Sequence, residues 1–404
     1  MAPGTARNPF RIHGVVEDEY FTNRAEEVER IVKTLREPGA KLLVYGPRRM
    51  GKTSALARAA SRIRADGGHV IMADLSTASS VTDIGNRVLE AAARSLGRRW
   101  RDLVQDFVDR LHVTVTLTPD TAAGIIIPSL DVHLRRADLD DQRNTLGKVL
   151  DAMEGMARDR KTTIGIVLDE FQEICKFGGE DAEWHLRGVI QGQHHVSYVL
   201  SGSATHVIER MTDTGRAFYG LLDQLYIGPI DPSHLARWID SRMEAAGVAT
   251  SGVGEHAIRL VGPRTRDIIQ LARKCFDRTR AVGTAGPPEV DDAFREILEE
   301  QDDLWRSLWE QLTSLQQNVL RAVAAGTDGL TTQVTLERFS LGSSGSATNS
   351  AAALVAVGRL LKAEGGTGYG FDSPYFRGWV ILHTLADIGL LPPSDLGITP
   401  LTPP

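Results

Sequence analysis

The residues from Gly46 to Thr53, GPRRMGKT, have the types and spacing of a phosphate-binding loop, G-x-x-x-x-G-K-[ST]. The glycines allow a sharp turn, so that successive backbone N–H groups point inward at an anion. A helix that begins near Lys52 would direct its positive dipole end at the same anion. We expect Lys52 to reach the β- and γ-phosphates and the Thr53 hydroxyl to ligate magnesium. The candidate nucleotide-binding residues of this loop are Gly46, Pro47, Arg48, Arg49, Met50, Gly51, Lys52, Thr53 and Ser54.

An acidic pair follows a second apolar run, because Ile164–Leu168 leads directly into Asp169 and Glu170. A carboxylate at the end of a buried strand is costly unless a cation or a hydrogen-bond donor compensates it. A magnesium ion near Thr53 would do so, which predicts Asp169 as a second metal ligand. Glu170 is then placed to act as the general base for an attacking water. The plainer interpretation of the pattern is a strand that runs into an acidic turn.

The next apolar strand, Val196–Leu200, ends in Ser201, Gly202 and Ser203. If this strand lies beside the one that carries Asp169, a polar residue at its end could contact the γ-phosphate or the water. Ser201 and Ser203 are both candidates for this catalytic role. A simple turn at the end of the strand is the alternative.

The elements around these residues alternate between strand and helix. Short apolar runs predict strands at 41–45, 69–75, 163–168 and 196–200, and helical spacing predicts helices at 53–65 and 84–96. This alternation indicates an α/β parallel sheet with crossover connections. One stretch departs from it: two strand-like segments lie within about 112–134, joined by turn residues. We interpret them as a hairpin insertion, which is either a surface decoration or a contact device for a neighbour or a ligand.

Helical patterns dominate after Ser233, and a linker-like break, GTAGPP, occurs at 283–288. A further unit begins at Trp305, with helices predicted at 312–325 and 347–364 and an extended segment at 369–379. This order of helix, turn, helix and hairpin is typical of a winged helix-turn-helix. The sequence therefore predicts four parts: an α/β domain with the phosphate-binding loop at 8–230, a helical part at 231–300, a winged helix at 305–385 and a disordered, proline-rich tail at 389–404.

The totals for 404 residues exclude several classes of protein. The formal net charge of −6 argues against a general polyanion binder, and two distant cysteines give neither a disulfide framework nor a zinc site. The N-terminus lacks the apolar core of a signal peptide, and no stretch approaches 18 apolar residues. We expect a cytoplasmic protein that does not interact with membranes.

Several of these segments together resemble the AAA+/STAND branch of P-loop ATPases, especially the archaeal-type ATPases. The loop YGPRRMGKTS and the segment LDEFQEI carry the resemblance most specifically, and SGSAT, FYG at 218–220 and SPYFRGW also fit. The opening, with Asn8-Pro9-Phe10 and an F-x-x-R-x-x-E segment from Phe21, fits as well. The resemblance implies an α/β parallel-sheet P-loop NTPase core with a helical lid and a C-terminal winged-helix domain. It also implies that Phe21 and Arg24 lie beside the adenine of ATP or ADP, with Mg²⁺ as the cofactor.

The resemblance further implies two arginines that act on the γ-phosphate. Relatives usually have an arginine soon after the FYG-like segment, whereas Leu221 stands there in this chain. Arg216 or Arg210, upstream of that segment, is therefore the candidate for an arginine finger. In the lid, Arg266 is the candidate sensor arginine and Arg264 is the reserve. The alternative for both lid residues is a solvated arginine at the start of a helix.

The C-terminal unit leaves the type of partner open. Between Trp305 and Leu385 there are six basic and five acidic residues, and the small, uncharged start of the candidate recognition helix suits packing against protein. Ser346, Thr348 and Asn349 could instead contact bases of DNA. We therefore expect an ATP-hydrolysing regulatory switch that acts through a protein partner or self-assembly. The alternatives are a DNA-binding ATPase resembling replication initiators or helicase loaders, and a nucleotide-binding structural module with negligible turnover.

Overall fold

The computed structural model describes residues 7–12, 20–95, 114–119, 128–133, 139–203, 212–327, 329–362 and 368–390. These residues form two compact units. One unit comprises Glu17–Gly228, and the other comprises Met1–Val16 together with Pro229–Pro404.

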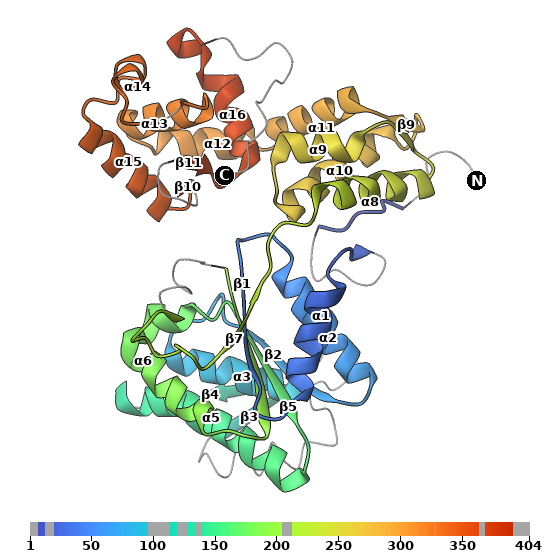
Figure 1. Cartoon of the computed structure of the whole chain (residues 1–404), viewed down its shortest axis with the longest axis vertical. Helices are drawn as coiled ribbons and strands as arrows, with labels where there is room; N and C mark the ends of the chain where they lie inside the picture. Colours follow the sequence, from blue (N-terminus) through green and yellow to red (C-terminus); the bar gives the residue numbers. More distant parts are fainter. Residues whose placement is uncertain are drawn as a thin grey trace. The chain divides into compact units, whose positions relative to one another are not determined.

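The first unit is built on a five-stranded parallel sheet with the order β2-β5-β6-β1-β7 (Figure 1). The two central strands β5 and β6 are buried along their whole length, as their continuous apolar sequences predict. The strands are β1 (Lys41–Tyr45), β2 (His69–Asp74), β5 (Ile164–Asp169), β6 (Val196–Gly202) and β7 (Asp223–Tyr226).

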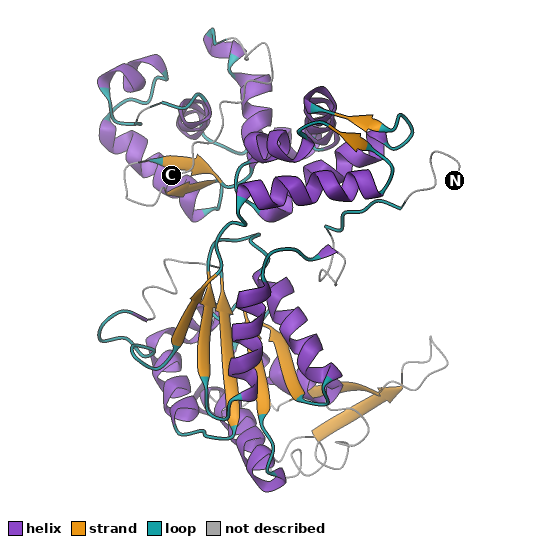
Figure 2. Cartoon of the chain, turned by 45° about the vertical axis from the view of Figure 1, so that its right-hand side comes forward, coloured by secondary structure: helices purple, strands orange, loops and turns teal. Residues whose placement is uncertain are grey.

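Helices cover both faces of this sheet, and the alternation of side chains along each strand assigns each residue to one face (Figure 2). Leu42 and Val44 of β1 pack in the core with α1 (Ala25–Arg36) and α2 (Lys52–Ala65). Leu43, between them, belongs to the core on the other face. That core also contains residues of α3 (Val81–Ser95), α5 (Leu139–Arg160) and α6 (Glu173–Gln191). The α/β parallel-sheet architecture expected from the sequence is thus confirmed.

The segment expected to be a hairpin insertion does form a pair of strands. β3 (Thr114–Pro119) and β4 (Pro128–His133) pair antiparallel, with Thr114 opposite His133. This hairpin lies between α3 and α5 in the chain, outside the parallel sheet.

The second unit contains helices and two small pairs of strands. Asn8 and Phe10 from the N-terminal segment are hydrogen-bonded to Arg273 of this unit, and Phe10 lies in its core. The elements are α8 (Pro232–Ala245), β8 (Ala249–Thr250), α9 (Val253–Val261), α10 (Thr265–Thr279), β9 (Thr284–Ala285), α11 (Pro287–Glu300), α12 (Asp302–Glu310), α13 (Ser314–Ala324), α14 (Gln333–Arg338), α15 (Ser344–Ala356), β10 (Leu360–Lys362), β11 (Tyr369–Phe371) and α16 (Pro374–Thr384).

One hydrophobic core connects the helices before and after residue 300. Phe294 of α11 stacks on Tyr375 of α16 with ring centroids 5.6 Å apart. Gly378 of α16 lies so close to Phe294 that an added Cβ would come within 2.7 Å of the ring. The hydroxyl of Tyr375 also donates a 2.7 Å hydrogen bond to the carbonyl of Asp267 in α10. The expected lid and winged-helix segments therefore pack as one body.

Two predicted elements near the C-terminus were wrong in extent. The helix expected at 347–364 ends at Ala356, because Gly358 is left-handed (φ 68°) and β10 follows it. The segment expected to be extended at 369–379 becomes helical from Pro374, because Ser373 caps that helix and proline suits its first turn. Most of the tail predicted to be disordered, 391–404, lies outside the described residues.

None of the helices within the described ranges is both long and apolar enough to cross a membrane.

Candidate nucleotide-binding site

The loop between β1 and α2 has the backbone that its glycines allow. Gly46 adopts φ 147°, and a Cβ added there would lie 2.1 Å from the carbonyl oxygen of Ile227, just after β7. Gly51 is left-handed (φ 91°) and caps the N-terminus of α2. The first N–H groups of α2 therefore open toward the loop, which is the arrangement that binds phosphate. Arg49 is also left-handed, at φ 67°, and this conformation is uncommon for a residue with a side chain.

Lys52 is buried at the base of this loop, with 5% of its surface exposed. Its ammonium donates hydrogen bonds to the carbonyls of Gly46 (2.9 Å) and Pro47 (2.8 Å). Burial lowers the pKa of Lys52, and the nearby carboxylates of Glu170 and Asp169 oppose that shift. An ammonium has three donors, so this cation has a further N–H for a phosphate oxygen.

Thr53 and Asp169 meet at the carboxyl end of the sheet. The Thr53 hydroxyl donates a 2.7 Å hydrogen bond to Oδ2 of Asp169, which is 3% exposed at the end of β5. Burial raises the pKa of Asp169, and the hydrogen bond from Thr53 opposes that shift. A hydroxyl and a carboxylate are oxygen ligands of the kind that magnesium takes. Within the described part of the chain, no cluster of three or more His, Cys, Asp or Glu residues could hold a metal ion.

Glu170 follows in a left-handed conformation, φ 55°, which is unusual for a residue with a side chain. Its Oε2 accepts a 2.8 Å hydrogen bond from the hydroxyl of Ser203 and a second one from the amide of Gln172. The carboxylate is thus held from two sides, by the end of β6 and by the start of α6. Sequence reasoning did not identify Gln172, although it lies within the LDEFQEI segment, because no spacing rule relates it to Glu170.

The two serines after β6 differ in their surroundings. Ser201 is fully buried, and its hydroxyl lies beside the carboxyl of Asp169, where a hydrogen bond from it lowers the pKa of Asp169 against the effect of burial. The carbonyl of Ser201 accepts a 2.7 Å hydrogen bond from the amide of Phe171, which joins β6 to the turn that carries Glu170. Ser203 therefore contacts Glu170 directly, whereas the hydroxyl of Ser201 acts on Asp169.

Arg24 binds the phosphate loop to the end of the sheet. Its guanidinium donates to Glu27 (2.7 Å), to the carbonyl of Met50 (3.5 Å) and to the carbonyl of Gly228. The side chain is buried, at 8% exposed. The sequence did not predict that Arg24 joins the loop to Gly228. The family resemblance implied only that Arg24 lies beside the adenine.

The other predicted residues of the loop and its surroundings are more exposed. Arg48 and Arg49 project from the loop toward solvent, and Ser54 is half-buried in the first turn of α2. The charge of Arg48 contributes to the lowered pKa of Lys52, after burial. Phe21 packs against the core on the α1 and α2 face, and the guanidinium of Arg58 lies 5.0 Å from the centre of its ring.

The predicted arginine finger is engaged in ion pairs. Arg216 pairs with Glu183 (2.9 Å), which is 2% exposed in α6, and with Glu180 of the same helix. The other candidate, Arg210, lies outside the described residues.

The two arginines that were expected in a lid belong to the second unit. Arg264 is buried and forms a 3.0 Å ion pair with Asp372, next to β11. Arg266 is exposed in the first turn of α10.

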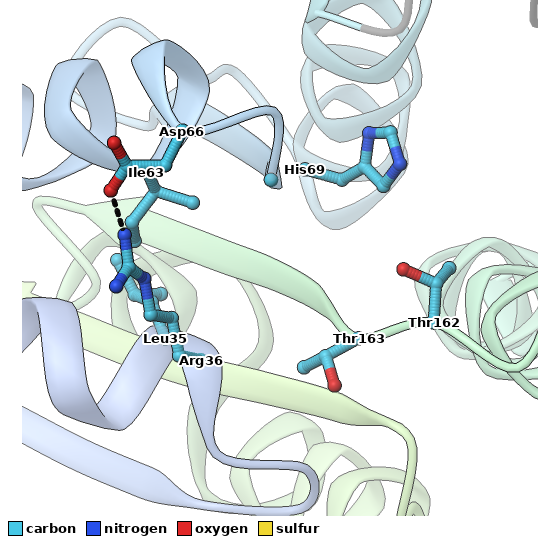
Figure 3. A pocket seen from close by; sticks show the side chains of 8 residues that line it. Leu35, Arg36, Ile63, Asp66, His69, Thr162 and Thr163 are labelled. Atoms are coloured by element: carbon cyan, nitrogen blue, oxygen red, sulfur yellow. Dashed lines mark hydrogen bonds and ion pairs between the residues drawn. The ribbon is translucent and has the colours of Figure 1, made fainter.

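A cavity of about 330 Å³ lies elsewhere in the first unit, at the amino ends of the strands (Figure 3). His69 begins β2, Thr163 immediately precedes β5, and Arg36 pairs with Asp66 across the ends of α1 and α2. The phosphate loop and Asp169 occupy the carboxyl ends of their strands. This cavity is therefore separate from the candidate site.

The parallel sheet and the loop between β1 and α2 define a P-loop NTPase fold. A family model for an ATPase domain predominantly from Archaea matches residues 21–226, and the chain belongs to this family. The match begins at Phe21 and ends at Tyr226, the last residue of β7. It therefore covers the phosphate loop and the two acidic residues Asp169 and Glu170 at the end of β5.

Two solved structures are similar to the chain over almost its whole length. A Walker-type ATPase of Pyrococcus abyssi has a TM-score of 0.57 at 14% identity, covering 92% of this chain and 99% of that chain. The ORC2 protein of Aeropyrum pernix, in ADPNP–ADP complexes, has a TM-score of 0.56 at 14% identity, covering 95% of this chain and 98% of that chain. At such low identity these likenesses concern the fold alone. A search of curated proteins finds no match.

Proposed function

We propose that this protein binds ATP and hydrolyses it with magnesium, as a regulatory switch of the AAA+/STAND type. The observation that carries the proposal is the 2.7 Å contact between Thr53 and Asp169 at the mouth of the phosphate loop. Glu170 follows Asp169, and its carboxylate is held by Ser203. A metal ligand pair beside a held carboxylate is the arrangement that hydrolysis of a phosphoanhydride requires.

Each residue of the site has a role in this proposal. The loop amides and Lys52 stabilise the charge on the phosphates, and Glu170 accepts a proton from the attacking water. Thr53 and Asp169 would hold Mg²⁺, which supplies charge neutralisation of the phosphate oxygens when it is bound. Ser203 orients Glu170, and Ser201 offers its hydroxyl to the water or to the γ-phosphate. Phe21 and Arg24 are proposed to lie beside the adenine.

The output of the switch is proposed to be a change in domain arrangement or assembly. Residues 231–300 would act as a lid and 305–385 as a winged helix, with Arg266 as the sensor arginine. Its exposure in the first turn of α10 leaves its guanidinium accessible. A finger role for Arg216 would require release of its ion pairs with Glu180 and Glu183.

The surface of α15 favours a protein partner over DNA. Its exposed residues are small and uncharged, and include Thr348, Asn349, Ala352, Ala353 and Ala356. A helix that binds a duplex normally brings several cations to the phosphates. DNA binding stays the alternative, and its affinity would fall with a steep log–log salt slope. A slope near zero would exclude that alternative.

The rate of ATP hydrolysis tests the proposed activity when it is measured for the wild type and for the variants Glu170→Gln and Lys52→Ala. We expect Lys52→Ala to lose nucleotide binding and Glu170→Gln to keep binding but to hydrolyse at least about 100-fold more slowly. If the wild type is as slow as Glu170→Gln, the protein is a nucleotide-binding structural module instead.

Mass measurement in solution with ADP and with a non-hydrolysable ATP analogue tests assembly, and equal masses would contradict nucleotide-driven association.

A further inference from the structure

Gln172 uses only half of its side-chain amide in the structure. Its Nε2 donates to Oε2 of Glu170, whereas its Oε1 is buried and accepts no hydrogen bond from the residues that the structure describes. The residue is 8% exposed. A buried acceptor without a donor destabilises a folded protein, so such a group in a native site needs an explanation.

The orientation of this amide follows from the chemistry of its neighbour. An ionised carboxylate only accepts hydrogen bonds, so the NH₂ end of Gln172 must face Glu170. The carbonyl end must then point elsewhere. Rotation of the amide would bring its oxygen against the carboxylate oxygen, and this arrangement is repulsive.

The backbone around Gln172 is held firmly. Gln172 immediately precedes α6, and its backbone carbonyl accepts a 3.2 Å hydrogen bond from the backbone N–H of Cys175. Phe171 is 1% exposed and packs edge-on against Phe218, with centroids 5.3 Å apart. The amide of Phe171 is bonded to β6 through Ser201. The side chain of Gln172 is thus placed by a rigid frame, as a group that acts in catalysis should be.

The distance between the amide oxygen of Gln172 and the carboxylate of Glu170 allows one water to bridge them. The nitrogen and oxygen of one amide are about 2.2 Å apart. A hydrogen bond of up to about 3.2 Å to Glu170 therefore keeps Oε1 of Gln172 within about 5.4 Å of Oε2 of Glu170. A water that donates one near-linear hydrogen bond of about 2.8 Å to each of two oxygens bridges oxygens that are about 4.4 Å apart, which is within this limit.

We propose that Gln172 is a further catalytic residue, whose amide oxygen accepts a hydrogen bond from the water that attacks ATP while its amide nitrogen holds Glu170. This inference rests on the proposed function. The water oxygen bonds to the γ-phosphorus, and the bond from that phosphorus to the bridging oxygen breaks, its electron pair leaving with ADP. One water proton passes to Glu170. The other proton, oriented by Gln172, stays on the new phosphate oxygen.

The substitution Gln172→Met tests this role, because methionine has a similar length but no amide. We expect kcat to fall by about 10- to 100-fold, while KM for ATP and the Kd of a non-hydrolysable analogue change by less than about threefold. Without nucleotide the melting temperature should stay within about 4 °C of the wild type, because the variant also removes a buried acceptor without a partner. Gln191→Met, at the exposed end of the same helix, is the matched control and should change none of these quantities.

A double-mutant cycle with Glu170→Gln separates catalysis from structure. If Gln172 acts on the same water, Gln172→Met should lower kcat by less than about threefold in the Glu170→Gln background. A purely structural role would give the full loss in both backgrounds, would weaken the analogue Kd and would lower the melting temperature. That result would overturn the inference.

The other outcomes are equally decisive. Unchanged kcat in Gln172→Met, together with loss of turnover in Glu170→Gln, would overturn the inference and leave the proposed function standing. Absence of turnover in the wild type would overturn both. If Gln172→Met does not fold, Gln172→Glu serves in its place, since it keeps the shape but replaces the donor with a second acceptor. It should lower kcat with the analogue Kd unchanged, and unchanged kcat there would also overturn the inference.

Discussion

The hydroxyl of Thr53 lies 2.7 Å from the carboxylate of Asp169, although the two residues are separated by 116 positions in the chain. The parallel pairing of β5 with β6 and of β6 with β1 brings their strand ends together. The contact joins the first turn of α2 to the end of a fully buried strand. It makes the phosphate loop and the acidic pair one site.

Asp169→Asn should separate stability from function. Burial raises the pKa of this carboxyl, which shows that its charge is unfavourable in the folded protein without a cation. Without nucleotide, we expect the free energy of unfolding of the variant to equal that of the wild type or to exceed it by up to about 1 kcal/mol. The affinity for ATP in the presence of magnesium should fall at least about tenfold.

Chemical denaturation and nucleotide titration with and without magnesium measure these two quantities. Asp159→Asn, an exposed position in α5, is the control and should change neither. Wild-type affinity for magnesium-bound ATP in Asp169→Asn would refute the metal role.

Gly46→Ala should damage the phosphate loop. The added Cβ would come within 2.1 Å of the Ile227 carbonyl oxygen, and the residue would keep a φ of 147° that suits glycine alone. We expect a loss of more than about 2 kcal/mol in the free energy of unfolding, or a displaced loop with nucleotide affinity lowered at least about tenfold. Gly188→Ala, in the helix α6 with nothing within 4 Å of its Cβ, should instead be neutral or stabilising by up to about 1 kcal/mol. Equal behaviour of the two variants in urea denaturation would contradict this account.

Arg24→Lys should loosen the connection between the phosphate loop and the end of β7. A lysine keeps the charge but cannot donate from one planar group to Glu27, Met50 and Gly228 together. We expect a loss of about 1–3 kcal/mol in the free energy of unfolding and weaker binding of a fluorescent ATP analogue. Arg30→Lys on the exposed side of α1 should leave both unchanged. A fully stable Arg24→Lys with normal affinity would show that this guanidinium is dispensable.

Glu154 should make the free energy of unfolding depend on pH. Burial by itself raises the pKa of Glu154. Its carboxylate, however, accepts hydrogen bonds from the backbone amides of His194, His195 and Val196 and from the His195 ring, and these lower the pKa below its ordinary value of 4.5. A lowered carboxyl pKa contributes stability that is present above the ordinary value and is lost as pH falls through the lowered one. The difference in free energy of unfolding between wild type and Glu154→Gln should therefore be larger at about pH 7 than at about pH 3.5. A difference that does not change with pH would mean that the charge of Glu154 is unimportant.

Strands and helices of the first unit were predictable because their signals are local. The continuous apolar runs before Gly46 and Asp169 predicted buried parallel strands, and both strands are present. The C-terminal elements were less predictable, because short caps decide them. Ser373 and Pro374 start a helix within a segment whose aromatic residues favour an extended structure, and Gly358 ends a helix whose pattern continues beyond it.

The sequence by itself determined the phosphate loop and the acidic pair. Each is a continuous segment, so neighbouring residues set both its chemistry and its backbone conformation. Only the tertiary structure decided that Ser203 and Gln172 both hold Glu170, and that Arg24 joins Met50 to Gly228. Only the tertiary structure also paired Arg216 with Glu183. These contacts depend on strand order and on how helices pack, and the free energy of such packing is not encoded in the spacing of any one segment.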